Sequence, residues 1–117
     1  MREPIRDRGR LEHIVSAIET IDTFVDGQTF DSFSSNMMMY FAIVKNIEII
    51  GEAAYMLTKE FRDNHHEVEW QDIISMRHVL VHGYYQISKA EVWDTVKNNL
   101  PPLKIQIEQY LSEKDQQ

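Results

Sequence analysis

Apolar residues recur at steps of three and four along most of this chain, which is the spacing of one face of an α-helix. The first such series begins at Leu11 and ends at Val25, and a polar stretch with Gly27 follows it. We therefore expect a helix, then a loop over residues 26–35 in which Asp31, Ser32 or Ser34 caps the next helix.

The second predicted helix is long, from about Ser34 to Phe61, and it is apolar around most of its circumference. A helix of this kind is buried on more than one side, and in so short a chain a natural second partner is another copy of the same chain. Gly51 lies inside this helix, where it weakens the helix by about 1 kcal/mol relative to alanine. Two interpretations remain open, a close approach of another helix or a tolerated glycine.

Three more helices are expected in the second half of the chain. A short one runs from about Glu69 to His82, and Gly83 stands where a left-handed residue would end it. Ser88–Glu91, "SKAE", has the form of a capping box that starts the fourth helix. Pro101 and Pro102 break the chain and restart it as the fifth helix.

No stretch alternates like a strand, so the sequence predicts an all-α protein, an up-and-down bundle of about five helices. A length of 117 residues is that of a single domain, which we expect to cover residues 1–117, with flexible ends at 1–8 and 113–117.

Composition narrows the function classes. The chain has no cysteine, which excludes disulfides and thiolate metal sites and favours a reducing cytoplasm. No apolar run reaches the length of a membrane span and no signal peptide is recognisable, so we expect a cytoplasmic protein with no membrane partner. The net charge of −7 argues against general coating of nucleic acid but allows a local basic site. The arginines at 2, 6, 8 and 10 are interpreted as a solvated N-terminal tail.

The stretch "SMRHVLVHGYYQIS", residues 75–88, concentrates basic and aromatic chemistry at one helix end. Arg77 offers a fork of donors that matches a phosphate, and His82, at the end of the helix, can exchange a proton near neutral pH. Together they are suited to phosphodiester cleavage without a metal. They lie about 140° apart around an ideal helix, however, and from spacing alone a capped helix end with a surface histidine is the commoner interpretation.

A metal site is a competing hypothesis. His78 and His82 are four residues apart and can share a helix face, and His65 and His66 could join them. The spacer between His78 and His82 is "VLV" and lacks the glutamate of catalytic zinc helices, so we expect no metal. His13, His65 and His66 are interpreted as surface residues.

"RHVLVHGY", residues 77–84, has the form Arg-x4-His-x-Tyr and resembles the signature of the HEPN superfamily, in particular of the HepT-like (DUF86) toxin family. Three further segments resemble that family in order along nearly the whole chain: "IEIIGEAA" at 47–54, the "W-x2-I-x2-MR" pattern at 70–77 and "VWDTVKNNLPPL" at 92–103.

This resemblance implies a helical HEPN-like bundle that forms a homodimer through the long second helix and the motif region, with the active site in the dimer cleft. It implies a metal-independent endoribonuclease without a cofactor, the toxin of a type VII-like toxin–antitoxin pair. Its partner would be a minimal nucleotidyltransferase (MNT) antitoxin that transfers AMP from ATP to the motif tyrosine. Carried over by position, Arg77 and His82 are the catalytic pair and Tyr84 is the AMPylation site, with Tyr85 as the adjacent alternative. We expect cleavage of RNA to leave a 2′,3′-cyclic phosphate.

The chain departs from the family pattern at two positions. His78 stands where a small polar asparagine is frequent, and Gly83 where aspartate is frequent. We place His78 and Tyr85 in the cleft as accessory residues, and Lys45 and Glu52 of the second helix could approach it. The alternative function is a non-catalytic HEPN module that binds a nucleotide, RNA or a partner protein.

Overall fold

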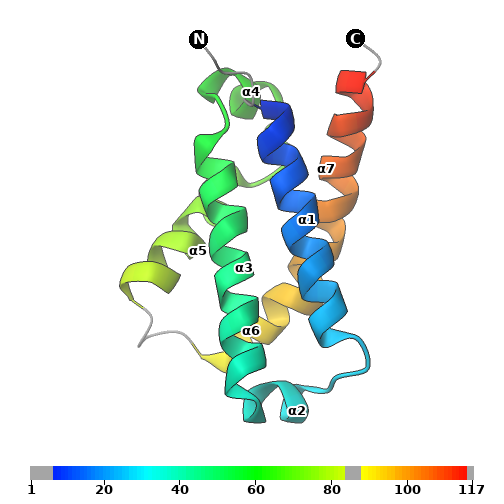
Figure 1. The fold of residues 1–117 in the computed structure, drawn as a ribbon. Helices are drawn as coiled ribbons and strands as arrows, with labels where there is room; N and C mark the ends of the chain where they lie inside the picture. The colour runs from blue at the N-terminus through cyan, green and yellow to red at the C-terminus, as the bar shows by residue number, and fades with distance from the viewer. Residues whose placement is uncertain (1–6, 84–87, 116–117) are drawn as a thin grey trace.

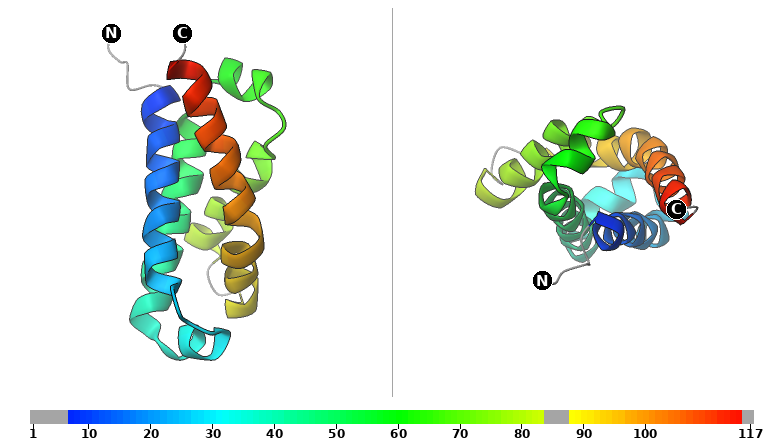
Figure 2. Two further views of the ribbon diagram at one scale, coloured as in Figure 1. Left: turned by 90° about the vertical axis from the view of Figure 1, so that its right-hand side faces the viewer. Right: turned by 90° about the horizontal axis from the view of Figure 1, so that it is seen from above.

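The computed structural model describes residues 7–83 and 88–115, and over these ranges the chain is helical with no strand. Three long helices form the body (Figure 1): α1 (Asp7–Val25), α3 (Met37–Met56) and α7 (Leu100–Asp115). A fourth, α5 (Trp70–His82), packs against α3 and extends outward beyond it, as the view from above shows (Figure 2). The predicted all-α bundle is confirmed. None of the described helices combines the length and the apolar character needed to cross a membrane.

Neighbouring long helices run in opposite directions. The carboxylate of Asp7 accepts hydrogen bonds from the backbone N–H and the hydroxyl of Thr58, at 2.9 and 2.8 Å. This contact joins the beginning of α1 to the chain that follows α3, so the two helices are antiparallel. The end of α7 lies beside the beginning of α1, which completes the up-and-down arrangement (Figure 1).

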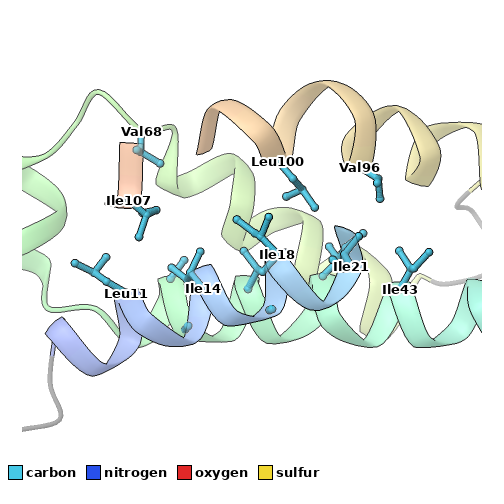
Figure 3. Packing of buried hydrophobic residues seen from close by; sticks show 14 of the residues in the cluster. Leu11, Ile14, Ile18, Ile21, Ile43, Val68, Val96, Leu100 and Ile107 are labelled. Carbon is cyan, nitrogen blue, oxygen red and sulfur yellow. The ribbon is translucent and has the colours of Figure 1, made fainter. Parts of the chain in front are cut away.

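The core forms where the apolar face of α1 meets α3 and α7 (Figure 3). Leu11, Ile14, Ile18 and Ile21 of α1 are fully buried. They recur at the steps of three and four that predicted this helix. Burial of each such side chain stabilises the fold by about 1.5–3 kcal/mol relative to exposure. The partners that other elements contribute include Phe33, Ile43, Ile50, Val92, Val96, Leu100 and Ile107.

The loop predicted over residues 26–35 is wrong in part, because it contains a short helix, α2 (Phe30–Ser35). Thr29 caps α2 in a capping box with Ser32. α3 is capped by Asn36, whose side-chain oxygen accepts from the N–H of Met39 at 3.0 Å. The predicted caps of this long helix, Asp31, Ser32 and Ser34, therefore lie inside α2. Short polar side chains occupy many neighbouring positions here, and spacing alone could not select among them.

The long helix also ends earlier than predicted, at Met56. Leu57 is extended, with φ −62° and ψ 148°, and its side chain is buried. Thr58 then caps a new helix, α4 (Lys59–Asn64), by accepting from the N–H of Phe61. The apolar spacing continues through Leu57 because this side chain enters the core, which hid the boundary in the sequence.

The C-terminal helices confirm one prediction and correct another. Ser88 caps α6 (Lys89–Asp94) in the expected box with Glu91. The chain does not break at Pro101 and Pro102, which lie in the first turn of α7; it passes instead through a π-helical turn, η2 (Thr95–Asn99). The wider turn is closed by the N–H of Leu100, which bonds the carbonyl of Thr95. Helix also covers residues 7–8 and 113–115, within the ends that we expected to be flexible.

Candidate functional site

Arg77 lies where α5 and α3 are in closest contact. A Cβ added to Gly51 of α3 would collide with the Cβ of Arg77 and would lie 3.2 Å from the carbonyl oxygen of Ile73. Only glycine leaves room for this approach. Of the two interpretations of Gly51, close helix packing is therefore correct.

The guanidinium of Arg77 is held by the next residue of α3. Its Nε lies 3.1 Å from Oε1 of Glu52, and the Arg77 side chain is 35% exposed. This ion pair leaves the terminal nitrogens of the guanidinium available to a second acceptor. Glu52, which the sequence placed only near the cleft, is thus a direct partner of the candidate catalytic arginine.

His82 is the last residue of α5, as predicted, and its side chain is exposed. Gly83, the C-cap, donates its N–H to the carbonyl of Val79 at 2.7 Å, an ordinary α-helical hydrogen bond that closes the last turn. Gly83 has a φ of −124°, so the predicted left-handed conformation is wrong. The rings of His78 and His82 lie 4.8 Å apart, centre to centre, and are inclined by 51°. The two imidazoles therefore stand together on the exposed end of the helix.

Within one chain, Arg77 pairs with Glu52 of α3, whereas the ring of His82 lies beside that of His78. Five residues of an ideal α-helix turn about 140°, so positions 77 and 82 are on different faces of α5. Tyr84 and Tyr85, the candidate modification site and its neighbour, lie outside the described residues.

A hollow of about 250 Å³ opens beside Arg77 on the outer surface of α3. It is lined by Arg10, His13, Lys45, Glu48, Ile49, Glu52, Ala53 and Arg77, which come from α1, α3 and α5. Arg10 was interpreted as part of a solvated tail and His13 as a surface residue. Both belong to α1, and their spacing of three on one helix face was the signal that could have grouped them.

Two larger hollows are less suited to a phosphate. One of about 450 Å³, between α3, α5, η2 and α7, has Glu67, Glu69 and Asp72 in its lining. The other, between α5 and α6, is lined by Asp72, Glu91 and Asp94. Carboxylates repel an anionic ligand, so these hollows do not compete with the surroundings of Arg77.

The histidines do not gather into a metal site in the part of the chain that the structure describes, where no group of three or more His, Asp or Glu side chains has a suitable arrangement. His65 is not a surface residue as predicted. Its ring stacks on Phe61 at 3.9 Å, meets Tyr110 at 4.5 Å and bonds the carbonyl of Phe61 through Nδ1 at 2.9 Å. His65 therefore belongs to the packing between α4 and α7.

Tyr110, in the same cluster, has the largest pKa shift among the described residues. Burial, and then the hydrogen bond that its hydroxyl donates to Glu67 at 2.9 Å, raise the pKa of Tyr110 to about 12. The pKa of Glu67 is lowered in return, mainly by a hydrogen bond to backbone and then by the bond from Tyr110. Tyr110 and Glu67 lie away from Arg77 and His82, so this pair has a structural role.

Comparisons with known proteins agree with the motif. The family model HepT-like (Ribonuclease HepT-like) matches residues 14–110. The protein "Putative RNase TTE0752" of Caldanaerobacter subterraneus subsp. tengcongensis is 36% identical over 104 residues, which cover 89% of this chain and 93% of that protein. "Probable ribonuclease HepT" of Thermococcus cleftensis is 36% identical over 94 residues, or 80% of this chain and 86% of that protein.

A third relative has a longer chain. "Gamma-glutamylcyclotransferase and putative RNase MJ0434" of Methanocaldococcus jannaschii is 33% identical over 105 residues, which cover 90% of this chain and 47% of that protein. No solved structure matches this chain. Since the family model and two relatives above 30% identity each span most of it, the chain belongs to the HepT-like ribonuclease family.

Proposed function

We propose that this chain is a metal-independent endoribonuclease whose catalytic residues are Arg77 and His82. The observation that carries the proposal is the support of Arg77. Gly51 brings α5 against α3, and Glu52 then fixes one edge of the guanidinium while its other nitrogens stay available. An arginine held in this way is preorganised for a phosphate, because little side-chain freedom remains to be lost on binding.

The chemistry follows from the two side chains. The imidazole of His82 accepts the proton of a ribose 2′-hydroxyl, and the 2′-oxygen attacks the adjacent phosphorus. Arg77 stabilises the negative charge that develops on the phosphoryl oxygens. The bond to the 5′-oxygen breaks, and this oxygen takes up a proton. The products are a 2′,3′-cyclic phosphate and a 5′-hydroxyl end.

A second copy of the chain would complete the site. Positions 77 and 82 lie about 140° apart around an ideal helix, so a phosphate between two chains would meet Arg77 of one and His82 of the other. The outward face of α3 supports this arrangement. Exposed apolar side chains lie towards both ends of that face, Met37, Met38 and Phe41 at one end and Tyr55 and Met56 at the other, and these would make the contact. Lys45, Glu48 and Glu52 lie between them and line the hollow, which would remain open as the cleft. Such a surface is typical of an interface rather than of a solvated helix.

The toxin role and its control are part of the same proposal. AMPylation of Tyr84 by a minimal nucleotidyltransferase would place a bulky anion two residues after His82, where it would repel RNA. Mass spectrometry after incubation with such an enzyme and ATP tests this step, with Tyr84→Phe and Tyr85→Phe as the two informative variants. Absence of an adduct on either tyrosine would contradict it.

The central experiment is cleavage of a mixed RNA pool by the purified protein in the presence of EDTA. We expect cleavage by the parent protein, loss of cleavage in Arg77→Ala and His82→Ala, and full activity in the control His66→Ala, whose histidine is exposed on a different part of the chain. Loss of activity with EDTA, or products with 3′-hydroxyl ends, would contradict the mechanism.

One observation favours a second function. The carboxylate of Glu52 already occupies Nε of Arg77, and a substrate phosphate would have to share the guanidinium with it. If the pair persists with RNA bound, the module binds RNA or a partner without cutting. A folded dimer that binds the RNA pool and leaves it intact would select this alternative.

A further inference from the structure

The hollow beside Arg77 collects more basic side chains than the cleavage mechanism uses. Arg10 and His13 come from α1, Lys45 from α3 and Arg77 from α5, on a chain whose net charge is −7. Only Arg77 has a role in the chemistry proposed above. The other three form a local basic group on an acidic protein, and such a group attracts phosphate even where the total charge does not.

The two carboxylates of the hollow, Glu48 and Glu52, do not neutralise the positive charge of this basic group. Glu52 pairs with Arg77, and Glu48 makes only a long contact with Lys45, 3.8 Å from Nζ to Oε1. The Lys45 side chain is largely exposed, so this contact is weak and a phosphate can replace it. Arg10 has no carboxylate within ion-pair distance among the residues that the structure describes.

Helix packing fixes the place of these side chains. The hydrogen bonds from Thr58 to Asp7 set the register of α1 against α3, which brings the first turns of α1 to the level of Glu52. On α3, Lys45 lies seven residues before Glu52 on the same face, roughly 10 Å away along the helix. The basic side chains therefore begin at Arg77 and continue across α3 to α1.

We propose that Arg10, His13 and Lys45 form a second phosphate-binding subsite, which holds the RNA backbone beside the scissile phosphate. The inference rests on the proposed ribonuclease function and adds a substrate class to it: an RNA chain with at least one phosphate beyond the one that is cut. A positively charged groove that follows the backbone is the usual way in which proteins hold a single strand.

Substrate length tests this subsite separately from catalysis. A dinucleoside monophosphate carries only the scissile phosphate and cannot occupy the subsite, whereas an oligonucleotide occupies both positions. We expect the double variant Arg10→Gln/Lys45→Gln to lower kcat/KM for an oligonucleotide by about tenfold or more, since two cations no longer hold its backbone, and to leave kcat/KM for the dinucleotide unchanged. The control Lys59→Gln/Lys104→Gln makes the same change in net charge on α4 and α7, outside the hollow, and should change neither.

Binding gives a second measurement. In a His82→Ala background, which removes the proposed proton acceptor, the double variant should reduce the slope of log K against log salt by about 0.7, the value for the one subsite phosphate that is no longer neutralised. Glu48→Gln should act in the opposite direction and strengthen RNA binding by about twofold, because it removes a carboxylate from the hollow.

The outcomes separate the two proposals. If the parent protein cleaves RNA but the double variant matches its charge control with both substrates, the subsite is wrong and the proposed function stands. If the double variant loses activity equally on the dinucleotide and the oligonucleotide, Arg10 and Lys45 act at the scissile phosphate and the subsite is again overturned. If the parent neither binds nor cleaves RNA, both proposals fail together.

Discussion

Two histidines stand at helix ends in this protein, and their surroundings differ in every respect. His65 follows α4 and is packed between Phe61 and Tyr110, with Nδ1 bonded to a backbone carbonyl. His82 ends α5, is exposed, and has His78 as its ring neighbour. A ring that stacks on one aromatic side chain, meets another and bonds a backbone carbonyl contributes to stability, and a ring open to solvent can exchange protons with a substrate. Position at a helix end does not distinguish these roles, but packing does.

The largest expected effect is a contrast between substitutions of these two histidines: one should impair RNA cleavage and the other should impair folding stability. His82→Ala should lower RNA cleavage by about 100-fold or more and leave stability within about 0.5 kcal/mol of the parent. His65→Ala should destabilise the fold by about 1–2 kcal/mol, since it removes ring packing and a hydrogen bond, while the folded fraction keeps its activity. Urea denaturation and a cleavage assay on both variants measure the contrast. An equal loss of activity in both variants would contradict the distinction between a structural His65 and a catalytic His82.

The second effect concerns the packing of Gly51 of α3 against Arg77 of α5. Gly51→Ala would force its Cβ against Arg77, and we expect a loss of about 1–3 kcal/mol in the free energy of unfolding together with reduced cleavage. Gly27→Ala is the matched control. Gly27 has a φ of +75° with open space around it, so the same substitution there costs about 1 kcal/mol through backbone strain and leaves activity intact. Stability and cleavage that fall together in both variants would show a general folding effect.

A smaller effect is expected from substitution of Glu52, the ion-pair partner of Arg77. Glu52→Gln keeps the shape of the side chain but removes its charge, so we expect kcat/KM to fall by about tenfold as the guanidinium loses its orientation. Stability should change by less than about 1 kcal/mol, because the ion pair is half exposed. Glu12→Gln, which breaks the exposed Arg8–Glu12 pair of α1, serves as the control for loss of a surface carboxylate. Higher activity in Glu52→Gln would instead show that Glu52 competes with the substrate for Arg77.

The last effect is seen only at high pH and belongs to the region around His65. The pKa of Tyr110 is raised to about 12 from its ordinary value of 10, so its neutral form is favoured in the fold. The resulting stabilisation is fully present below pH 10 and is lost as the pH rises from about 10 to about 12. Urea midpoints at pH 9 and pH 12 should therefore differ less in Tyr110→Phe than in the parent. Tyr55→Phe, at an exposed position, should behave as the parent does, and an unchanged pH dependence in Tyr110→Phe would contradict this role.

The sequence predicted the elements whose signals are local. The buried face of α1, the box at Ser88 and Glu91 and the end of α5 at His82 were all found, because spacing and capping chemistry depend on a few neighbouring residues. The boundary at Leu57 was missed because an apolar residue continued the pattern while its backbone turned extended. The π-helical turn before Pro101 was missed for a similar reason, since a wider turn leaves the apolar spacing nearly unchanged.

In the candidate site too, features with a local sequence signal were predicted and features that depend on tertiary packing were missed. Arg77 and His82 were assigned from the motif, and both lie on α5 as the spacing predicted. The contact of Gly51 with Arg77 and the grouping of Arg10 with Lys45 depend on how helices distant in the sequence pack. Tertiary packing of this kind leaves no periodic signal. His65 was misjudged for the same reason, since its two ring partners are on α4 and α7.

The hydrogen bonds between Asp7 and Thr58 have a practical consequence for labelling the molecule. They bring the beginning of α1 to the chain after α3, and α7 ends at this same pole of the bundle (Figure 1). The C-terminal end of α5, whose last residue is His82, projects from the flank, away from that pole (Figures 1 and 2). A fluorescent protein or surface tether joined before α1 or after α7 would thus lie at that pole, away from the end of α5, and leave that end accessible to solvent.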